Sequence, residues 1–435
     1  MGNVMFHREI EVRHDVDILV VGGGPAGIAA AVIAARQGAK VFLAEGSSCL
    51  GGMGTIGLVP AFMIFSDGKN FLAAGIGEEV LNKMWQYGGK VEGSTHSIKA
   101  EALKRVYDDM VTEAGVDFAF HTQMVAVDAA DGEVNHVIFA AKSGMFAVKA
   151  KIYIDGTGDG DLCAWAGAEF EKGDQNGDMM AGTLCSIWSD VDWDDVKKPD
   201  RRRLDEAFQN KVFTNEDRHL PGMWRIGKSL GGGNIGHTYG VDSTDERSLT
   251  QSLLWGRKSL MEYEKYYKEY LEGYEDMELV TTGALLGIRE SRRIIGDYVM
   301  VLDDFNNRAS FDDEIGRYSY PVDIHASNAS KESYSNFEKE FYNLRYKEGE
   351  SYGIPYRALT PKGLDNVLVT GRCVSCDRYM QSSIRVMPGC YITGQAAGIA
   401  AVIAAEKNTD IRGFDVKELQ QRLKESGAYL PNFNE

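Results

Sequence analysis

The sequence lacks an excess of positive charge, is poor in cysteine and begins without an apolar segment. Its 47 Lys and Arg stand against 64 Asp and Glu, whereas a nucleic-acid binder normally carries a basic surface. Six cysteines in 435 residues are too few for a disulfide scaffold. The opening MGNVMFHREIEVRHD has no apolar core of a signal peptide. We therefore expect no nucleic-acid partner and a location in the reducing cytoplasm.

Uninterrupted apolar runs are also missing. Residues 18–35 and 386–405 are uncharged over a length that could cross a membrane. However, the first stretch contains GGGP at residues 22–25, and the second contains Pro388 and Gly389. A strand, a turn and a helix explain the first stretch, and a buried helix after a turn explains the second. We expect no membrane partner.

The chain is long and rich in glycine. A chain of 435 residues suits two domains, and 49 glycines suit the tight turns of nucleotide-binding proteins. After about residue 189 the sequence becomes charged and aromatic, and strand–turn–helix character returns near residue 354. We predict an α/β protein in which residues 1–185 and 351–435 form a Rossmann-type nucleotide-binding domain. Residues 186–350 would be an inserted α+β substrate domain, with a long core-packed helix within 249–270.

The strongest motif is a glycine-rich turn between a strand and a helix. The strand DILVV is followed by GGGPAG at residues 22–27, an Ala-rich helix and a second strand over residues 40–44. In this pattern Gly22 permits the tight turn, Gly24 lets a pyrophosphate approach the backbone, and Gly27 lets helix and strand pack closely. The free N–H groups of the helix attract phosphate. Glu45 ends the second strand, where an acid binds the ribose hydroxyls.

Two other segments imitate this spacing. No convincing strand precedes GGGNIG at residues 231–236, so we predict a loop there that could lie at the substrate site. GTGDGD at residues 156–161 follows a strand, but no carboxylate follows at the right distance. The sequence thus contains one dinucleotide fingerprint, which argues against a built-in NAD(P)H domain.

The sequence resembles FAD-dependent oxidoreductases of the glutathione-reductase-like superfamily. The segments that carry the likeness are DILVVGGGPAGIAAAVIAARQGAKVFLAE, LGGMGT, KIYIDGTGDGDLCAWAGAEF, GALLGIRESRRIIGDYVM, PVDIH, YGIPYRALTPKGLDNVLVTGRCVS and SIRVMPGCYITGQAAGIAA. More narrowly, the chain is similar to the bacterial FAD-dependent oxidoreductase family that is distantly related to fumarate reductase flavoproteins. The likeness covers nearly the whole chain in the family's order. It implies a flavin enzyme that binds FAD.

The resemblance also implies a set of cofactor residues. The expected pyrophosphate contacts are Gly22, Gly24, Pro25, Ala26 and Gly27, with Glu45 at the adenosine ribose. Those expected beside adenine, phosphates and ribityl chain are Gly51, Gly52, Met124, Thr157, Gly158, Gly371 and Arg372. Relatives often carry an acid where Arg372 stands. Gly394, Gln395 and Ala396 would open the last Ala-rich helix, whose N-terminus would then point at the flavin C2 carbonyl.

Candidates for the chemistry come from two arginines of GIRESRR and two further residues. On a helix, Arg289 and Arg292 would share a face and could bind a carboxylate or stabilise an enolate. The alternative is a buried salt-bridge network with Glu290 and Asp297. His325 in PVDIH could be a proton donor or base. Arg385 lies just before the flavin-facing helix and is a comparable candidate.

Cys373 and Cys376 form a C-x-x-C pair after a strand expected beside the flavin. A redox-active disulfide is chemically feasible there, but thiol reductases of that type also carry the NAD(P)H domain that this sequence lacks. No second Cys/His pair stands at zinc-ligand spacing, so we expect no metal.

These observations predict an oxidoreductase that transfers a hydride between a small polar organic substrate, an alcohol or sugar-like molecule, and flavin N5. One alternative is reduction of an activated alkene, and another is a non-catalytic flavin-binding subunit. A tRNA-modifying role is disfavoured by the net charge of −17. The electron donor or acceptor is not specified by the sequence, and a homo-oligomer is compatible with it.

Overall fold

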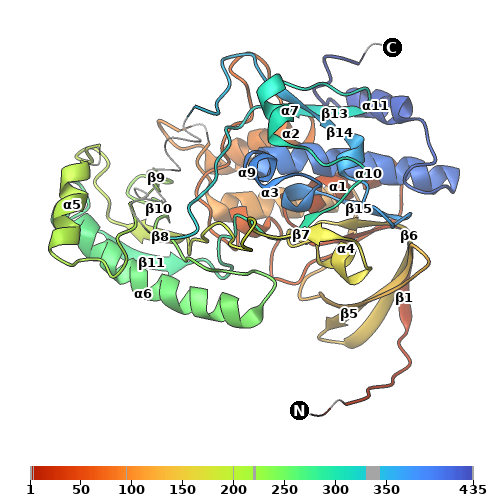
Figure 1. Ribbon diagram of the computed structural model, residues 1–435, viewed down its shortest axis with the longest axis horizontal. Helices are drawn as coiled ribbons and strands as arrows, with labels where there is room; N and C mark the ends of the chain where they lie inside the picture. The colour runs from red at the N-terminus through yellow and green to blue at the C-terminus, as the bar shows by residue number, and fades with distance from the viewer. Residues whose placement is uncertain are drawn as a thin grey trace.

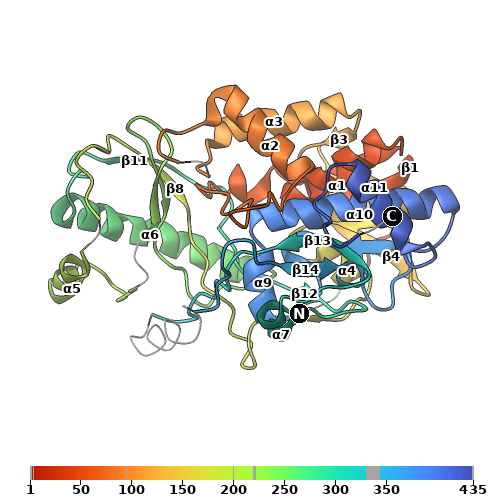
Figure 2. The same ribbon diagram turned by 90° about the horizontal axis from the view of Figure 1, so that it is seen from above.

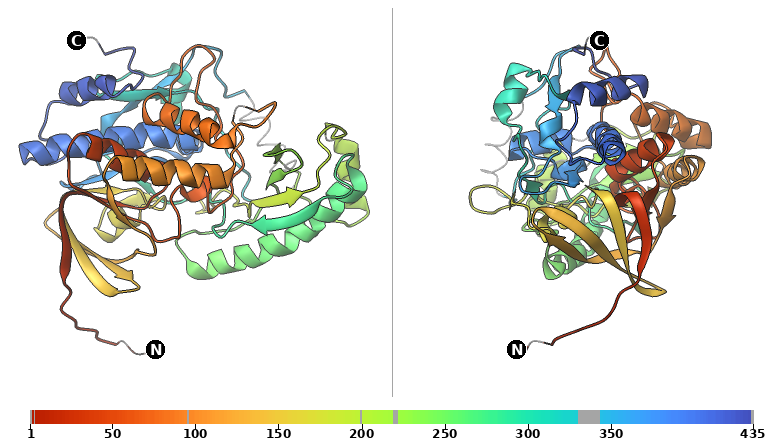
Figure 3. Two further views of the ribbon diagram at one scale, coloured as in Figure 1. Left: turned by 180° about the vertical axis from the view of Figure 1, so that it is seen from behind. Right: turned by 90° about the vertical axis from the view of Figure 1, so that its right-hand side faces the viewer.

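The computed structural model describes residues 2, 4–94, 96–198, 200–218, 222–329 and 343–433. Figure 1 shows a nucleotide-binding part, in which helices cover a central sheet, and a lobe around the long helix α6 (Glu246–Tyr270). Seen from behind, in Figure 3, α6 runs along the lobe and away from the central sheet. The chain therefore combines helices and sheets in two regions.

The central sheet has seven strands in the order β3-β2-β1-β6-β5-β4, with β15 also paired to β6. Their bounds are Val12–Val21 (β1), Val41–Ala44 (β2), Asp117–Ala119 (β3), Gln123–Ala130 (β4), Glu133–Ala141 (β5), Gly144–Asp155 (β6) and Val367–Val369 (β15). The pairs β1–β2, β1–β6, β2–β3 and β6–β15 are parallel, whereas β4, β5 and β6 form an antiparallel meander. The predicted α/β class and the parallel Rossmann-type arrangement are confirmed.

Strand β1 is apolar on both faces because both faces of the sheet are covered. Ile18 and Val20 pack in a cluster with α1 (Pro25–Arg36) and α10 (Met387–Lys407). Leu19 and Val21 point the other way, into a second cluster with the meander. A strand buried on two sides reads as a continuous hydrophobic run, as the sequence shows here.

Helices α1 and α10 lie side by side in Figure 2 and meet at backbone distance. A Cβ atom on Gly394 would lie 2.2 Å from the carbonyl oxygen of Ala26, and one on Gly398 would lie 2.4 Å from that of Ala30. By length and composition α10 could cross a membrane, but it is buried throughout within the protein. Among the described residues this part also contains the α-helices α2 (Ile76–Met84), α3 (Ala100–Glu113), α4 (Asp161–Trp165), α7 (Leu302–Asn307), α9 (Arg378–Ile384) and α11 (Val416–Glu425).

The lobe has its own antiparallel sheet and its own core. Its strands run in the order β11 (Glu278–Thr282), β8 (Ser186–Ser189), β10 (Gly231–Asn234) and β9 (Gly222–Arg225), with α5 (Arg201–Gln209) and α6 beside them. The long helix expected within residues 249–270 is confirmed, and it buries Leu260, Tyr263 and Tyr267.

The loop predicted over the second glycine pattern is wrong, because residues 231–234 form strand β10. A Cβ atom on Gly233 would lie 2.9 Å from Trp188 Nε1, so glycine here lets the strand approach a buried indole. Close packing explains the glycines of this run, whereas Asn234, at the end of β10, lines a cavity that is described below.

The chain returns to the nucleotide-binding part well before residue 350. Strand β12 (Arg293–Ile294) pairs with β7 (Phe170–Glu171), and β13 (Glu314–Tyr318) pairs with β14 (Tyr352–Pro355). Tyr318 and Ile324 pack in the first cluster, with α1 and α10. The division at residues 185 and 350 stays a prediction, and this packing favours an earlier return.

Candidate active site and cofactor cavity

Three glycines of the first turn have three different physical roles. Gly22 has φ +95°, and a Cβ atom on it would lie 2.6 Å from the carbonyl oxygen of Gly156. On Gly27 the same atom would lie 1.9 Å from the carbonyl oxygen of Gly22. Gly24 differs, because its φ is −72° and the nearest atom to an added Cβ is 3.9 Å away. Gly22 and Gly27 are required by the fold, whereas Gly24 keeps space open.

That space is part of a cavity of about 1670 Å³. It extends from the end of β2 past the first turn to the end of β15. The predicted cofactor residues that line it are Gly22, Gly24, Pro25, Ala26, Glu45, Gly52, Met124, Thr157, Gly158, Gly371 and Arg372. Gly27 and Gly51 were also expected at the cofactor but do not line this cavity, because Gly27 packs on the backbone of Gly22, and Gly51 packs on Thr55 with φ +103°.

Glu45 is held at the edge of this cavity by backbone donors. Its Oε2 accepts a hydrogen bond of 2.7 Å from the N–H of Gly23, and its Oε1 accepts one of 2.7 Å from that of Ser47. The carboxylate therefore lies at the strand end, as the ribose-binding role requires.

The predicted start of the last Ala-rich helix is wrong. Helix α10 begins at Met387, with Pro388 in its first turn, where the missing N–H of proline costs nothing. Gly394, Gln395 and Ala396 lie inside the helix and do not line the cavity, and Gln395 Oε1 instead accepts from the N–H of Ile76 at 2.8 Å. Met387 does line the cavity, so the helix N-terminus still faces it.

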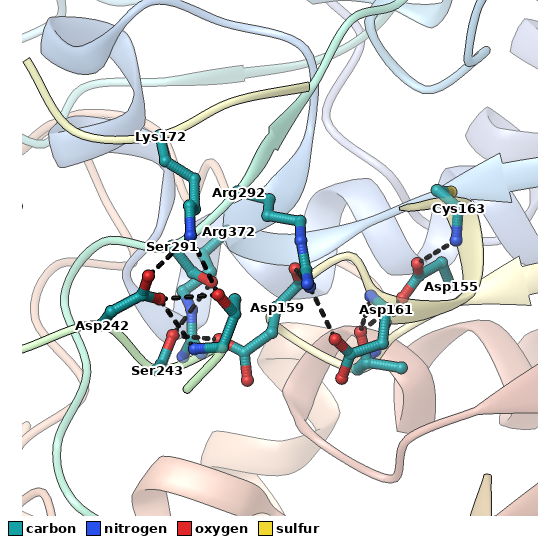
Figure 4. Close-up of polar contacts among 12 residues, drawn as sticks. Asp155, Asp159, Asp161, Cys163, Lys172, Asp242, Ser243, Ser291, Arg292 and Arg372 are labelled. Carbon is teal, nitrogen blue, oxygen red and sulfur yellow. Dashed lines mark hydrogen bonds and ion pairs between the residues drawn. The ribbon is translucent and has the colours of Figure 1, made fainter. Parts of the chain in front are cut away.

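Arg372 lies beside the loop that follows β6, in a polar network drawn in Figure 4. Its Nη2 donates to Asp159 Oδ1 at 2.8 Å, and Ser243, from the lobe, donates to the same oxygen at 2.7 Å. Nε of Arg372 is buried and has no hydrogen-bond partner among the described residues. A cation at this wall, joining the lobe to the nucleotide-binding part, suits an anionic or electron-rich ligand.

A second, smaller cavity of about 690 Å³ adjoins the first. The residues that line both are Met53, Ile288, Arg372, Arg385 and Met387. Several polar residues line the second cavity but not the first, namely Arg289, Asp323, His325, Tyr320 and Asn234. Three of the four predicted catalytic residues, Arg289, His325 and Arg385, thus meet in one space next to the larger cavity.

Arg289 is buried in this wall with its guanidinium fixed by three acceptors. Nη1 donates to the carbonyl of Ala181 at 2.9 Å and to Thr183 Oγ1 at 2.8 Å, and Nη2 donates to Asn234 Oδ1 at 3.1 Å. Burial, and next the charge of Arg385, lower the pKa of Arg289 to about 10. The side chain therefore remains a cation at neutral pH.

Asp323 links two of the cavity's basic groups. Arg385 Nη2 donates to its backbone oxygen at 2.9 Å and to its Oδ2 at 3.2 Å, and His325 Nε2 lies 3.4 Å from the same Oδ2. Burial favours the protonated acid, but His325 in its protonated form, together with the cations Arg385 and Arg289, holds the pKa of Asp323 well below its usual range. The cavity therefore contains a carboxylate as well as cations.

The prediction that Arg289 and Arg292 share a helix face is wrong. The structure gives residues 288–292 no helical conformation, so successive side chains diverge. Arg292 Nη1 donates to Asp161 Oδ1 at 2.6 Å and to the carbonyl of Asp159 at 3.0 Å, as Figure 4 shows. It lies outside the second cavity. Its role there is to fix the loop that follows β6.

The expected salt-bridge network also has different members. Glu290 is fully buried and pairs with Arg293 at 2.6 Å and with Arg378 at 3.1 Å. Asp297 pairs with Arg412 instead, at 2.7 Å. Neither acid contacts Arg289 or Arg292, so the two arginines have independent environments.

Arg292→Lys is expected to retain its FAD and most of its activity, because lysine can keep an ion pair with Asp161. The matched change Arg289→Lys removes a planar guanidinium that donates to three acceptors, which one ammonium group cannot reproduce in the same geometry. It should therefore cause a large loss of turnover. Turnover and FAD content of both purified variants give the measurement. Equal losses in the two variants would contradict this division of roles.

The cysteine pair gives no support for a redox-active disulfide. Cys373 and Cys376 are buried as free thiols, and burial raises the pKa of both above the usual thiol value. A reactive thiol needs the opposite shift and some exposure. Among the described residues, no three His, Cys, Asp or Glu side chains are grouped to hold a metal ion.

Sequence reasoning missed two residues behind His325. His237 Nε2 lies 3.1 Å from His325 Nδ1, and Asp217 Oδ2 lies 2.9 Å from His237 Nδ1. No local pattern distinguishes either residue. Their partners become visible only when the lobe is placed against the nucleotide-binding part.

The large cavity fits FAD. Gly24 leaves room at the N-terminus of α1, Glu45 stands at the strand end for a ribose, and the space continues to the buried cation of Arg372. A Rossmann-type fold with this cradle and an adjoining polar cavity defines an FAD-dependent flavoprotein. The chain belongs to the FAD dependent oxidoreductase family, whose model matches residues 17–423. It is an FAD-dependent oxidoreductase, and FAD is its cofactor.

Solved structures of other flavoproteins are similar at low identity. A geranylgeranyl bacteriochlorophyll reductase-like protein from Thermoplasma acidophilum is 15% identical, with 95% of this chain and 84% of that chain covered and a TM-score of 0.49. A flavin-dependent brominase is 11% identical, with coverages of 94% and 83% and a TM-score of 0.48. The p-nitrophenol 4-monooxygenase of Pseudomonas putida is 12% identical, with coverages of 94% and 84% and a TM-score of 0.42. No curated protein matches the chain.

Proposed function

We propose that this enzyme transfers a hydride between a small polar organic substrate, an alcohol or sugar-like molecule, and flavin N5. The observation that carries the proposal is the second cavity, which combines acid–base groups with the five residues that it shares with the cofactor cavity. When bound, FAD supplies the hydride acceptor or donor. The chain itself has to bind the substrate, orient it and move its proton.

The polar groups of the second cavity divide these tasks. Arg289 and Arg385 present cationic N–H donors to substrate oxygens, and Asp323 presents an acceptor to hydroxyl groups. His325 is the imidazole in this cavity, the side-chain type that most often serves as general acid or base, so it would take the proton of a reacting hydroxyl. The apolar wall from Phe62, Met63 and Val386 excludes water beside them.

The direct test is anaerobic mixing of the FAD-loaded protein with a panel of polyols, sugars and hydroxy acids. Bleaching of the flavin absorbance by a member of this panel is the expected result. If no polyol, sugar or hydroxy acid bleaches the flavin, the dehydrogenase proposal fails.

A second candidate is reduction of an activated alkene. It is favoured by one observation, namely that Arg289 and Arg385 place two cations in one cavity, an arrangement that suits a substrate carboxylate. Reoxidation of the photoreduced enzyme by an unsaturated carboxylic acid, without bleaching by any alcohol, would favour this candidate over the first.

NADH or NADPH alone is expected to reduce the flavin slowly. The reason is that the chain has one dinucleotide turn, at residues 22–27, while β10 and the loop after β6 account for the other two glycine patterns. Stopped-flow absorbance with stoichiometric NADH and NADPH measures this rate. Complete bleaching within the instrument's first milliseconds would contradict the expectation.

We also propose the glutathione-reductase-like subtype for the FAD domain, with the lobe as an inserted substrate domain. The antiparallel meander β4-β5-β6 beside the parallel strands supports the subtype, and the separate core of residues 184–288 supports the insertion. A cytoplasmic location completes the proposal, and it is supported by the low cysteine content.

A further inference from the structure

Four side chains, three of them buried, form a row that runs from the lobe through His325 to the second cavity. The contacts are Asp217 Oδ2 to His237 Nδ1 at 2.9 Å, His237 Nε2 to His325 Nδ1 at 3.1 Å, and His325 Nε2 to Asp323 Oδ2 at 3.4 Å. Asp217, His237 and His325 are only 7%, 6% and 6% exposed. Of the four, His325 and Asp323 line the cavity.

Counting protons along the row fixes where each one sits. A carboxylate only accepts, so His237 carries its proton on Nδ1, facing Asp217. Its Nε2 is then an acceptor, and His325 has to donate from Nδ1. Nε2 of His325 also faces a carboxylate, that of Asp323, but at 3.4 Å and not at the 2.9 Å of the contact to Asp217, so with two protons on the four ring nitrogens it is the nitrogen that carries none. Two protons on the four ring nitrogens thus make His325 a base, and a third proton on Nε2 makes it an acid.

We propose that Asp217 and His237 are positioning residues that fix the tautomer of His325, so that its Nε2 exchanges the substrate proton. The inference rests on the function proposed above. When an alcohol is oxidised, the C–H bond breaks and its hydride goes to FAD. The O–H bond breaks, its proton forms an N–H bond at His325 Nε2, and the C–O bond becomes C=O. The reverse reaction returns the same proton. Asp217 and His237 neither gain nor lose one.

Other groups face the row from several elements. Tyr239 Oη lies 3.4 Å from His237 Nδ1, which is longer than the contact to Asp217, and Tyr263 Oη lies 3.4 Å from Asp217 Oδ2. At the cavity end, Arg385, Arg289 and Tyr320 surround Asp323. The two arginines offset the charges of the two carboxylates. The proton taken up by His325 therefore enters a row whose charges are already nearly balanced.

The length of the last contact also fits an exchangeable proton. At 3.4 Å, His325 Nε2 and Asp323 Oδ2 are farther apart than in a normal hydrogen bond, whereas the two contacts behind are within the normal range. A substrate oxygen can replace Asp323 as the partner of Nε2 without disturbing the rest. The Nε1–H of Trp255 donates to the carbonyl of His237 at 3.1 Å and so holds the loop that carries this histidine.

The test is nitrogen NMR of the FAD-loaded protein with ¹⁵N-labelled histidine, recorded across a pH series. In the wild type, Nδ1 of both histidines should stay protonated and only Nε2 of His325 should change. In Asp217→Asn, the amide N–H₂ can donate to His237 Nδ1, so both histidines should shift their proton to Nε2. A bare Nδ1 on His237 in the wild type would overturn the proposal, whatever the variant does.

The matched control is Asp128→Asn, because Asp128 contacts His136 Nδ1 at 3.0 Å on the exposed meander. It should leave the protons of His237 and His325 in place. With an identified substrate, Asp217→Asn should lower kcat and alter its pH profile while KM changes little, and unchanged kcat and pH profile would overturn the proposal. If the substrate panel gives no bleaching, the proposed function fails, but the nitrogen spectra still decide the tautomer.

Discussion

Gly24→Val is expected to give a folded protein that holds no FAD. The backbone of Gly24 has φ −72° and ψ −179°, a conformation that valine adopts readily. An added Cβ meets no protein atom closer than 3.9 Å, so the fold tolerates it. It projects instead into the cavity at the N-terminus of α1, where a pyrophosphate has to approach the backbone. The side chain and the phosphate cannot occupy the same space.

The measurement is the absorbance of the purified variant together with chromatography of the cofactor released on denaturation. The wild type should be yellow and release FAD rather than FMN, and Gly24→Val should be colourless with an unchanged circular dichroism spectrum. Gly22→Val is the contrasting variant, because φ +95° and the 2.6 Å approach to Gly156 make a side chain there incompatible with the fold. Stoichiometric FAD in folded Gly24→Val would show that phosphate binds elsewhere.

His325→Gln should lower turnover by roughly 10²–10⁴-fold, the usual range for a lost general acid or base. Glutamine can still contact His237 and Asp323, so the packing of the row persists. It cannot take up a proton, so the reacting hydroxyl loses its base. FAD content should not change, because His325 lines the second cavity and not the first.

The matched control for this variant is His136→Gln. His136 lies on the meander and pairs with Asp128 at the surface, so the same chemical change there should leave turnover intact. Turnover with the substrate found in the bleaching panel is compared for both variants. A His325→Gln enzyme with wild-type turnover would remove His325 from the proton transfer and leave Asp323 as the next candidate.

The cofactor cradle could be predicted from the sequence because its signals are local. Gly22, Gly24 and Gly27 act through the backbone of one turn, and Glu45 follows the next strand directly. A single strand–turn–helix–strand unit therefore places all four residues, and their spacing in the sequence is enough to predict it. The start of α10 also has a local signal in the sequence. Pro388 is typical of a first helical turn, whereas the predicted start at Gly394 was taken from the resemblance to the family.

The second cavity could be predicted only in part, because its partners come from distant segments. The composition of GIRESRR suggests a helix. Its side chains instead bind partners in distant segments: Arg289 donates to Thr183, near β8, whereas Glu290 pairs with Arg378 and Arg292 pairs with Asp161. Tertiary hydrogen bonds therefore outweigh helix propensity in this segment. His237 gave no signal at all, because a single histidine after a glycine run acquires meaning only from Asp217 and His325.

The contact between α1 and α10 joins segments that are far apart in the sequence, so α1 can pack only after α10 has been synthesised. The first turn and α1 are synthesised long before Gly371, Met387 and the helix that packs on Ala26 and Ala30. Until then the face of α1 that packs on α10 lacks its partner, and exposed apolar surface of this kind makes a folding intermediate prone to aggregation. A chain that stops before residue 387 would therefore contain the complete nucleotide fingerprint but lack Met387 and the helix that completes the cavity.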